Sequence, residues 1–334
     1  MAAFGKTFMP KMTLAKYENG QWQEFNLTSA EQLTLHPGAH VLHYASTCFE
    51  GLKAFRHRDG SVHIFRLENN VARMQQSARL LNLPEINAEQ LRAMIIRVVE
   101  EYVTEVPEPP GSMYIRPTLI GTEAAIGKAA APTDSAMLYV LLSPVGDYFA
   151  GGERALRLLV EEDGMRCAAH MGMIKSGGNY ASAMPHILAA KAGHQADQVL
   201  FAPNGDVQET GAANFLLLDG DELITKNLDS TFLHGITRDS LLTLAADMGY
   251  RVSERELTVS ELLERAAHED CEAALSGTAA VLAPVGELLH NGTLHKVGSG
   301  NIGTKVKQLR QALNAIQWGQ AADKYGWLTR VSQR

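Results

Sequence analysis

One lysine of this sequence stands where its amine could do chemistry. Lys175 ends an apolar run, 171–174, and is followed by Ser176, Gly177 and Gly178, after which the residues predict a helix. Glycines let the backbone approach another group closely. Burial on apolar residues lowers the pKa of a lysine, and the neutral amine is the form that attacks carbonyl groups. A lysine beside two glycines is more often an ordinary surface loop, so other motifs must decide between the two interpretations.

Two stretches have the composition of anion-binding turns. Gly235, Ile236 and Thr237 stand at the predicted start of a helix, where free N–H groups and the helix dipole favour a phosphate. Residues 276–279, Ser-Gly-Thr-Ala, expose backbone donors in a similar way. Arg66, at the end of a predicted strand, could add a positive charge. The simpler alternatives are a helix cap, a plain turn and a surface ion pair.

Glu209 is the most suggestive carboxylate. It follows a predicted turn, 203–206, and precedes Thr210 and Gly211, which open an apolar strand. A carboxylate placed there is expected to point into a cleft, with a hairpin-edge glutamate as the alternative. A lysine, phosphate-binding turns and an inward carboxylate are together the groups that pyridoxal phosphate requires, because its aldehyde, phosphate and pyridine nitrogen each need a partner.

Composition restricts the class of protein. The chain has 334 residues, enough for two domains that each bury a core. Its formal net charge of −7 argues against a nucleic-acid partner, which normally needs a basic face. No apolar run approaches the ~18 residues of a membrane span. The three cysteines, Cys48, Cys167 and Cys271, form no CxxC pair, so we expect a cytoplasmic enzyme with reduced thiols.

Turn and cap signals predict the elements that position these residues. Asn19-Gly20 indicates a two-residue hairpin. Helices are expected from about Glu68, after Asn87 and after Thr258, the last two with a cap residue three positions before a glutamine or a glutamate. Apolar residues at helical spacing give each of the first two helices one buried face.

The strand pattern and one glycine-rich stretch predict the domain organisation. Residues 112–120 and 136–145 are expected to be strands of a mixed sheet, and residues 272–285 one apolar strand interrupted by Ser-Gly-Thr. Three glycines in 146–152 mark a linker. We therefore expect an α+β fold with a smaller N-terminal α/β domain (1–145), a linker (146–154) and a larger C-terminal domain (155–334) of mixed or antiparallel sheet and helices that carries Lys175.

A set of motifs resembles one known family. In chain order they are FEGLKAFR, IFRLENNVARM, YIRPTLIGTE, SPVGDYF, KSGGNYA, QETGAANF, GITRDSLL and SGTAA, and with Tyr44 they span most of the chain, to Ala280. Together they closely resemble the branched-chain amino-acid aminotransferases of the class IV pyridoxal-phosphate family. The resemblance implies a fold-type-IV enzyme with pyridoxal 5'-phosphate as its cofactor. It also implies transamination of leucine, isoleucine or valine with 2-oxoglutarate, which gives branched-chain 2-oxo acids and L-glutamate.

The resemblance also assigns roles to single residues. Lys175 is similar to the Schiff-base lysine, Tyr180 to the phenol that hydrogen-bonds the cofactor's ring oxygen, and Glu209 to the partner of its pyridine nitrogen. The positions that match phosphate-binding residues are Arg66, Ile236, Thr237 and Thr278. The positions that match substrate-binding residues are Phe49, Tyr114, Arg116, Thr278 and Ala279. Tyr44 matches a residue that reaches in from the neighbouring subunit, which implies a homodimer or a higher homo-oligomer.

Two departures from the family pattern stand beside these roles. The stretch after SGTAA lacks the paired cysteines of mammalian mitochondrial relatives, so no redox switch is expected there. Lys128 stands where relatives often have a valine, so it is a second candidate, beside Arg116, for the cation that receives the γ-carboxylate of 2-oxoglutarate. The alternatives are a related class IV enzyme acting on D-amino acids or amines, an aminodeoxychorismate lyase, or an inactive relative that only binds ligands.

Overall fold

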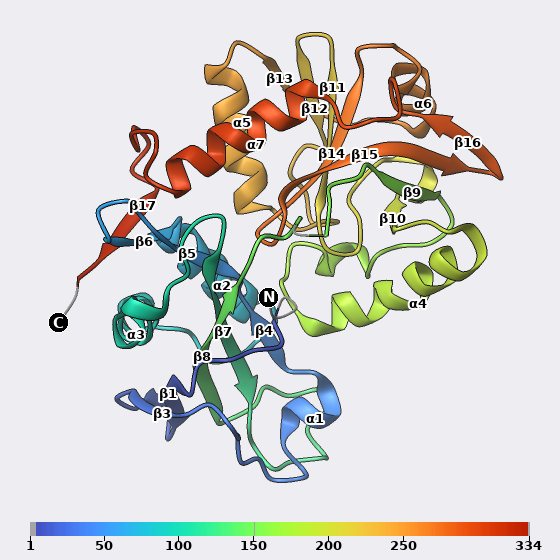
Figure 1. Ribbon diagram of the computed structural model, residues 1–334. Coiled ribbons are helices and arrows are strands. Elements are labelled where there is room, and N and C mark those ends of the chain that lie inside the picture. Colours follow the sequence, from blue (N-terminus) through green and yellow to red (C-terminus); the bar gives the residue numbers. More distant parts are fainter. Residues whose placement is uncertain (1–4, 150, 333–334) are drawn as a thin grey trace. The chain divides into compact units, whose positions relative to one another are not determined.

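The computed structural model describes residues 5–149 and 151–332. Figure 1 shows its elements, which divide between two compact units. Unit 1 comprises Met1–Ala150, Ile174–Gly177 and Ala315–Arg334, and unit 2 comprises Gly151–Met173 and Gly178–Asn314. The α-helices are α1 (His40–Tyr44), α2 (Leu67–Leu80), α3 (Ala88–Glu101), α4 (Gly177–His194), α5 (Ile236–Asp247), α6 (Val259–Ala266) and α7 (Thr304–Gln317). Short 3-10 helices occupy Val103–Glu105, Ala169–Met171 and Pro203–Gly205.

Unit 1 is built on a nine-stranded sheet. Its order is β17 (Leu328–Val331), β6 (Val62–Phe65), β5 (Leu52–Arg56), β7 (Ser112–Gly121), β8 (Ala136–Val145), β1 (Lys11–Glu18) and β2 (Gln21–Trp22), with β3 (Asn26–Ser29) on β1 and β4 (Thr47–Phe49) on β7. The hairpin predicted at Asn19-Gly20 is confirmed, because both residues have positive φ and join β1 to β2. All pairings given for these described strands are antiparallel, so the expected mixed sheet at 112–120 and 136–145 was wrong.

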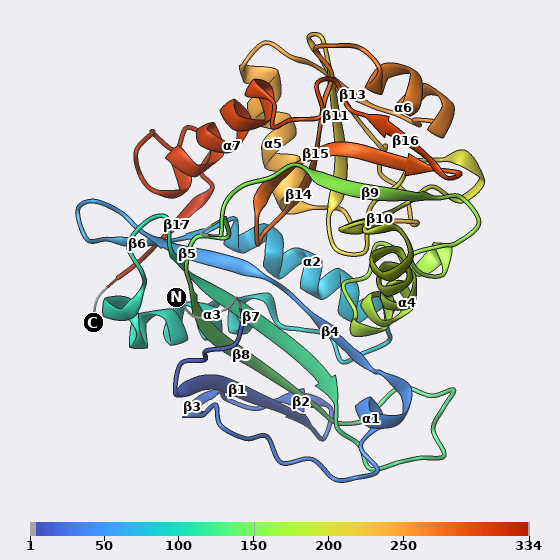
Figure 2. The same ribbon diagram turned by 45° about the vertical axis from the view of Figure 1, so that its right-hand side comes forward.

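Helices α2 and α3 lie side by side along this sheet (Figure 2). Met74 of α2 and Leu91 and Ile95 of α3 pack in the core of unit 1 together with Ile115 of β7. Burying each such side chain contributes about 1.5–3 kcal/mol. The predicted cap of α3 is confirmed, since the Asn87 side chain accepts the N–H of Gln90. The core therefore holds α2 firmly against the sheet.

Unit 2 is built on an eight-stranded sheet. Its order is β10 (Gln198–Phe201), β9 (Leu156–Glu161), β15 (Val281–His290), β14 (Glu272–Gly277), β11 (Asn214–Asp219), β12 (Glu222–Thr225) and β13 (Arg251–Glu254), with β16 (Thr293–Lys296) on β15. The sheet is mixed, because β9 runs parallel to β10 and β15, and β12 runs parallel to β13. The cap predicted at Thr258 is confirmed by its bond from the Glu261 N–H.

Residues 272–285 differ from their prediction as one interrupted strand. They form two antiparallel strands, β14 and β15, paired from Ala273↔Val285 to Gly277↔Val281. The chain therefore reverses at 278–280, Thr-Ala-Ala, while Ser276 and Gly277 are the last two residues of β14. An apolar run carries no sign of its direction, so the reversal was invisible in the pattern.

The boundary between the units also departs from the predicted domains. The tetrapeptide Ile174–Gly177, which contains Lys175, belongs to unit 1, and so does Ala315–Arg334. Strand β17 pairs with β6 over Leu328↔Phe65 to Val331↔Val62. With these additions unit 1 is slightly the longer of the two. No local sequence pattern indicates a strand pairing between residues so far apart in the chain.

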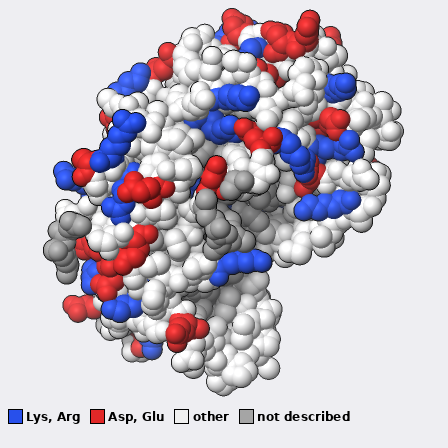
Figure 3. Space-filling view, in the orientation of Figure 1, with Lys and Arg blue, Asp and Glu red and all other residues white. Residues whose placement is uncertain are grey.

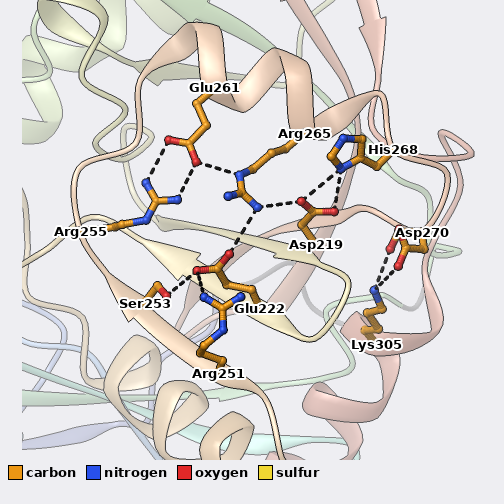
Figure 4. A network of polar contacts seen from close by, with 10 residues as sticks. All are labelled: Asp219, Glu222, Arg251, Ser253, Arg255, Glu261, Arg265, His268, Asp270 and Lys305. Carbon is orange, nitrogen blue, oxygen red and sulfur yellow. Dashed lines mark hydrogen bonds and ion pairs between the residues drawn. The ribbon is translucent and has the colours of Figure 1, made fainter.

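A network of ion pairs fixes helix α6 on unit 2 (Figure 4). Arg265 contacts Glu261, Asp219 and Glu222, with Nη1 of Arg265 2.8 Å from Asp219 Oδ2. Arg255 pairs with Glu261 as well, and this pairing lowers the pKa of the Glu261 carboxyl. The network joins β11, β12 and α6, so its role is in the fold of unit 2.

Lys53 of β5 is a buried lysine, and this makes the stability of the protein depend on pH. Burial lowers the pKa of its ammonium group to about 8, against an opposing effect of Asp147. In the unfolded chain the lysine keeps its proton to higher pH, so the unfolded state binds more protons above pH 8, and stability rises with pH there. We expect Lys53→Met to have a higher unfolding free energy at pH 7, and its advantage over wild type to shrink by about 2 kcal/mol between pH 7 and pH 10. Urea titrations across this range test the prediction, and a constant difference would contradict it.

The surface carries both signs of charge. On the face drawn in Figure 3, basic and acidic side chains are interspersed. A mixed surface of this kind provides no broad basic field for a nucleic-acid backbone. Among residues 5–149 and 151–332, no helix is long and apolar enough to cross a membrane.

Candidate active site

In unit 1 the backbone of Lys175 is held on both sides. Its N–H donates to Ser77 Oγ of α2 at 3.1 Å, and its carbonyl accepts the Phe49 N–H of β4 at 3.0 Å. The side chain is half-buried rather than fully buried. Its Nζ lies 5.2 Å from the centroid of the Phe49 ring. The predicted nucleophile is thus attached to two elements of unit 1.

Phe49 contacts a second cation besides the lysine. The guanidinium carbon of Arg116 lies 4.5 Å from the same ring centroid. Arg116 Nη2 donates to Tyr114 Oη at 2.8 Å, while its Nε is buried and has no hydrogen-bond partner among the described residues. A Cβ on Gly51 would lie 2.1 Å from Tyr114 Oη, so only glycine fits beside the phenol. Phe49, Tyr114 and Arg116, chosen from the sequence, therefore do gather around Lys175 in unit 1.

Arg66 begins α2 in an unusual backbone conformation. Its φ is 53° and its ψ 42°, a left-handed geometry that is uncommon for an arginine. The Arg66 N–H donates to Trp327 O, its guanidinium stacks over the Trp327 ring, and Nε donates to Asn69 Oδ1. The side chain is buried, so the alternative of a surface ion pair was wrong.

Tyr44 and Lys128 belong to a separate part of unit 1. The Tyr44 hydroxyl donates to the carbonyl of Ile126. Lys128 Nζ lies 2.7 Å from Glu123 Oε1 and 2.5 Å from Asp134 Oδ2. Hydrogen bonds to these two carboxylates raise the pKa of the Lys128 amine. Its charge already has two local partners, which favours Arg116 as the cation for an incoming carboxylate.

In unit 2 Glu209 is almost fully buried and strongly paired. Its Oε1 accepts the Leu233 N–H at 2.8 Å, and Oε2 accepts from Asn214 Nδ2 at 3.0 Å. Arg166 Nε lies 2.7 Å from Glu209 Oε1, an ion pair by distance whose N–H does not point along a hydrogen bond. A buried carboxylate needs such a cation to stay ionised. Arg166 was missed by the sequence reasoning, because nothing local marks it as the partner of Glu209.

The start of α5 in unit 2 suits an anion. Gly235 is the N-cap and has no side chain with which to cap the N–H groups of the first turn, to which Ile236 and Thr237 belong. A Cβ on Gly235 would lie 1.9 Å from Asn214 Oδ1, so only glycine allows this close approach to the residue that holds Glu209. Thr278 and Ala279 occupy the turn between β14 and β15, and Tyr180 lies in the first turns of α4. A helix start preceded by glycine and a buried carboxylate paired with an arginine, both in unit 2, fit the phosphate and the protonated pyridine nitrogen of pyridoxal phosphate.

A metal centre has no comparable support. In the described parts of the chain, no three histidine, cysteine, aspartate or glutamate side chains gather so that they could hold an ion. The cysteines Cys48, Cys167 and Cys271 are buried and free.

Comparison with known proteins places the chain in a family. Residues 47–288 match the family model for amino-transferase class IV. A probable branched-chain-amino-acid aminotransferase of Streptomyces coelicolor is 37% identical, over 97% of this chain and 91% of that protein. Branched-chain-amino-acid aminotransferase 2 of Bacillus subtilis is 35% identical, over 99% of this chain and 92% of its own length. The chain belongs to the class IV aminotransferases.

Solved structures show the same fold. A branched-chain amino acid aminotransferase of T.th., crystallised with pyridoxamine 5'-phosphate, superposes with a TM-score of 0.79 at 27% identity. The match covers 96% of this chain and 98% of that one. The same enzyme has been crystallised with N-(5'-phosphopyridoxyl)-L-glutamate and with 4-methylvaleric acid. The expected α+β fold of the fold-type-IV enzymes is thereby confirmed.

Proposed function

We propose that this protein transfers the amino group of leucine, isoleucine or valine to 2-oxoglutarate with pyridoxal 5'-phosphate as cofactor. The observation that carries the proposal is the pair of cations on Phe49. One aromatic ring contacts both the Lys175 amine and the Arg116 guanidinium. A transaminase of this kind must accept an apolar side chain and, in the second half-reaction, a carboxylate in the same place. An aromatic surface with one cation at its edge meets both demands.

The cofactor-binding residues follow from the same assignment. We assign the phosphate to Arg66, Ile236, Thr237 and Thr278, the ring oxygen to Tyr180 and the pyridine nitrogen to Glu209. When bound, pyridoxal phosphate supplies an electron sink for the negative charge that develops at the substrate Cα. Arg166 supports this role by keeping Glu209 ionised.

The other residues act on the substrate. Lys175 would move a proton from the substrate Cα to the C4′ carbon of the cofactor. Tyr114 orients Arg116 through its hydroxyl, and Phe49 covers the apolar side chain. Thr278 and Ala279 are assigned to the surface that bounds the substrate. Tyr44 is assigned to the side-chain pocket of a partner subunit, so we propose a homodimer or a higher homo-oligomer.

Replacing Arg116 with methionine separates the two substrates. We expect the leucine half-reaction of Arg116→Met to stay within about tenfold of wild type, because leucine presents no second carboxylate. The glutamate half-reaction should fall roughly a hundredfold or more, the ~3 kcal/mol of a lost charge-assisted pair. Single-turnover absorbance measurements on the purified holoenzyme, with each amino acid in turn, give both rates.

Lys128→Val is the matched control for this experiment. It removes the other candidate cation, whose charge Glu123 and Asp134 already balance, and should leave both half-reactions near wild type. If Lys128→Val alone impairs glutamate, the γ-carboxylate is bound by the loop. If both half-reactions fall together in Arg116→Met, Arg116 serves the fold or the shared α-carboxylate.

Two alternative functions would give different experimental results. A related class IV enzyme acting on D-amino acids or amines, or an aminodeoxychorismate lyase, would be inactive with L-leucine in a substrate panel. An inactive ligand-binding relative would purify without the yellow colour of bound pyridoxal phosphate. The motifs YIRP and SGTAA favour the branched-chain activity over the first alternative, and the presence of Lys175, Tyr180 and Glu209 argues against the second. We place the enzyme in the cytoplasm, where three buried, free cysteines stay reduced.

A further inference from the structure

Helix α2 carries a stripe of buried polar side chains that an amphipathic helix does not need. Asn70, Arg73 and Ser77 follow each other at spacings of three and four residues, so they share one face, and Arg66 precedes them on the same line. This face lies beside the apolar stripe of Val71 and Met74. Burying polar groups is unfavourable unless each has a partner. We therefore expect the side chains of this stripe to have specific polar partners in the structure.

Asn70 donates to the carbonyl of Arg66 within the stripe, whereas Ser77 and Arg73 contact residues around the candidate active site. Ser77 accepts the Lys175 N–H. Arg73 makes a two-pronged ion pair with Glu50, with Nε 2.7 Å from Oε1 and Nη2 2.8 Å from Oε2. The Glu50 side chain is 1% exposed and that of Arg73 is 10% exposed. Such a buried ion pair contributes little to stability compared with apolar residues of the same size, so stability alone does not account for it.

Glu50 lies between two residues that shape the substrate-binding surface. Its own N–H donates to Pro117 O at 2.9 Å, and its Oε2 accepts the Gly51 N–H at 3.2 Å. Phe49, on one side, donates its N–H to the Lys175 carbonyl and contacts Arg116 with its ring. Gly51, on the other side, packs against the Tyr114 hydroxyl. The Arg73 fork thus fixes the extended segment from Phe49 to Gly51, which joins β4 to β5 along β7, in position and in orientation.

We propose that Glu50 and Arg73 form a positioning pair that holds Phe49 against Arg116 and thereby determines how well the enzyme binds a dicarboxylic substrate. The proposal rests on the function proposed above. Arg116 is stacked on Phe49, which precedes Glu50, and is anchored by Tyr114, whose hydroxyl packs on Gly51. If this extended segment is loosened, the guanidinium can move away from the place where a γ-carboxylate is received. A branched side chain, which needs only apolar surface, is less sensitive to that movement.

The test variant is the double substitution Glu50→Gln/Arg73→Met. It removes both charges together, so no charge stays buried alone, and glutamine keeps an acceptor for the Gly51 N–H. The matched control is Glu68→Gln/Arg92→Met. It removes an exposed Glu–Arg pair between α2 and α3 with the same residue types, Nε to Oε1 2.8 Å. Arg73→Lys adds an intermediate step, because it keeps the charge but cannot grip both oxygens.

Two readouts distinguish positioning from stability. The first is the dissociation constant of the holoenzyme for glutarate and for 4-methylvalerate, the carbon skeletons of glutamate and leucine. In Glu50→Gln/Arg73→Met we expect glutarate to bind about tenfold or more weaker and 4-methylvalerate within about threefold of wild type. The second is the melting temperature, which should stay within a few degrees of wild type. For Arg73→Lys, the dissociation constant for glutarate should lie between those of wild type and Glu50→Gln/Arg73→Met. The Glu68→Gln/Arg92→Met control should bind both ligands with the dissociation constants of wild type.

The results distinguish a failure of the positioning role from a failure of the proposed function. Unchanged glutarate binding, or a parallel loss for both ligands together with a lower melting temperature, would overturn the positioning role. A wild-type enzyme that binds glutarate but does not transaminate leucine would overturn the proposed function instead. Since binding needs no turnover, the comparison of variants tests the Glu50–Arg73 pair in either case.

Discussion

Lys175→Arg will bind pyridoxal phosphate without becoming covalently attached to it, and its transamination rate will fall by roughly 10⁴-fold. The guanidinium keeps the positive charge of the lysine but is neither a nucleophile nor a proton carrier at neutral pH. Its backbone contacts to Ser77 and Phe49 do not depend on the side chain, so the fold of unit 1 should be preserved. Borohydride reduction of the wild-type holoenzyme followed by peptide mapping measures the attachment, and the same treatment of the variant should give no label.

Lys191→Arg is the matched control for this experiment. Lys191 is an exposed lysine in the last turn of α4, the helix that follows Lys175, and its replacement should change neither labelling nor rate. A label on any lysine other than Lys175 in the wild type would remove the basis of the assignment.

Glu209→Gln is expected to slow proton removal from the substrate on the order of a thousandfold, which corresponds to about 4 kcal/mol of barrier. Glutamine keeps one acceptor oxygen, enough for either the Leu233 N–H or the Asn214 amide, and it has no charge to stabilise a protonated pyridine nitrogen. Cofactor affinity should fall much less, because the phosphate contacts remain. Isotope-sensitive single-turnover rates with Cα-deuterated leucine report this step directly.

A second variant is needed to separate the effect of Glu209→Gln on the rate from its effect on stability through Arg166. Arg166 is buried, so Glu209→Gln leaves its charge without compensation and destabilises the fold as well. The double variant Glu209→Gln/Arg166→Gln removes that charge and should recover the melting temperature without recovering the rate. Near-wild-type turnover in either variant would contradict the role of Glu209.

Local signals in the sequence predicted the elements of this fold well. The caps at Asn87 and Thr258 and the turn at Asn19-Gly20 were correct, because each is decided by a few neighbouring residues. The strand over 272–285 was wrong, since strand direction depends on which neighbour the run pairs with. The pairing of β17 with β6 joins residues more than 250 positions apart, and no local pattern encodes it.

The candidate site shows the same limit. Motifs identified Lys175, Arg116 and Phe49, which the structure brings together in unit 1. They did not identify the side chains that hold such residues in place, namely Arg166 beside Glu209 and Arg73 beside Glu50. Each of these arginines looks like an ordinary surface charge in the sequence. A buried partner is visible only when two distant segments meet.

The division of unit 1 among three stretches of chain has a consequence for biosynthesis. Strand β17 and Trp327 leave the ribosome only after all of unit 2 has been made. Until then the edge of β6 has no neighbour, and Arg66 lacks both the carbonyl and the ring of Trp327. The nascent chain therefore presents an open strand edge, the kind of surface that chaperones cover and that misassembly exploits. Arg66, which we assign to the phosphate, therefore reaches its final environment only late in folding, after Trp327 has been synthesised.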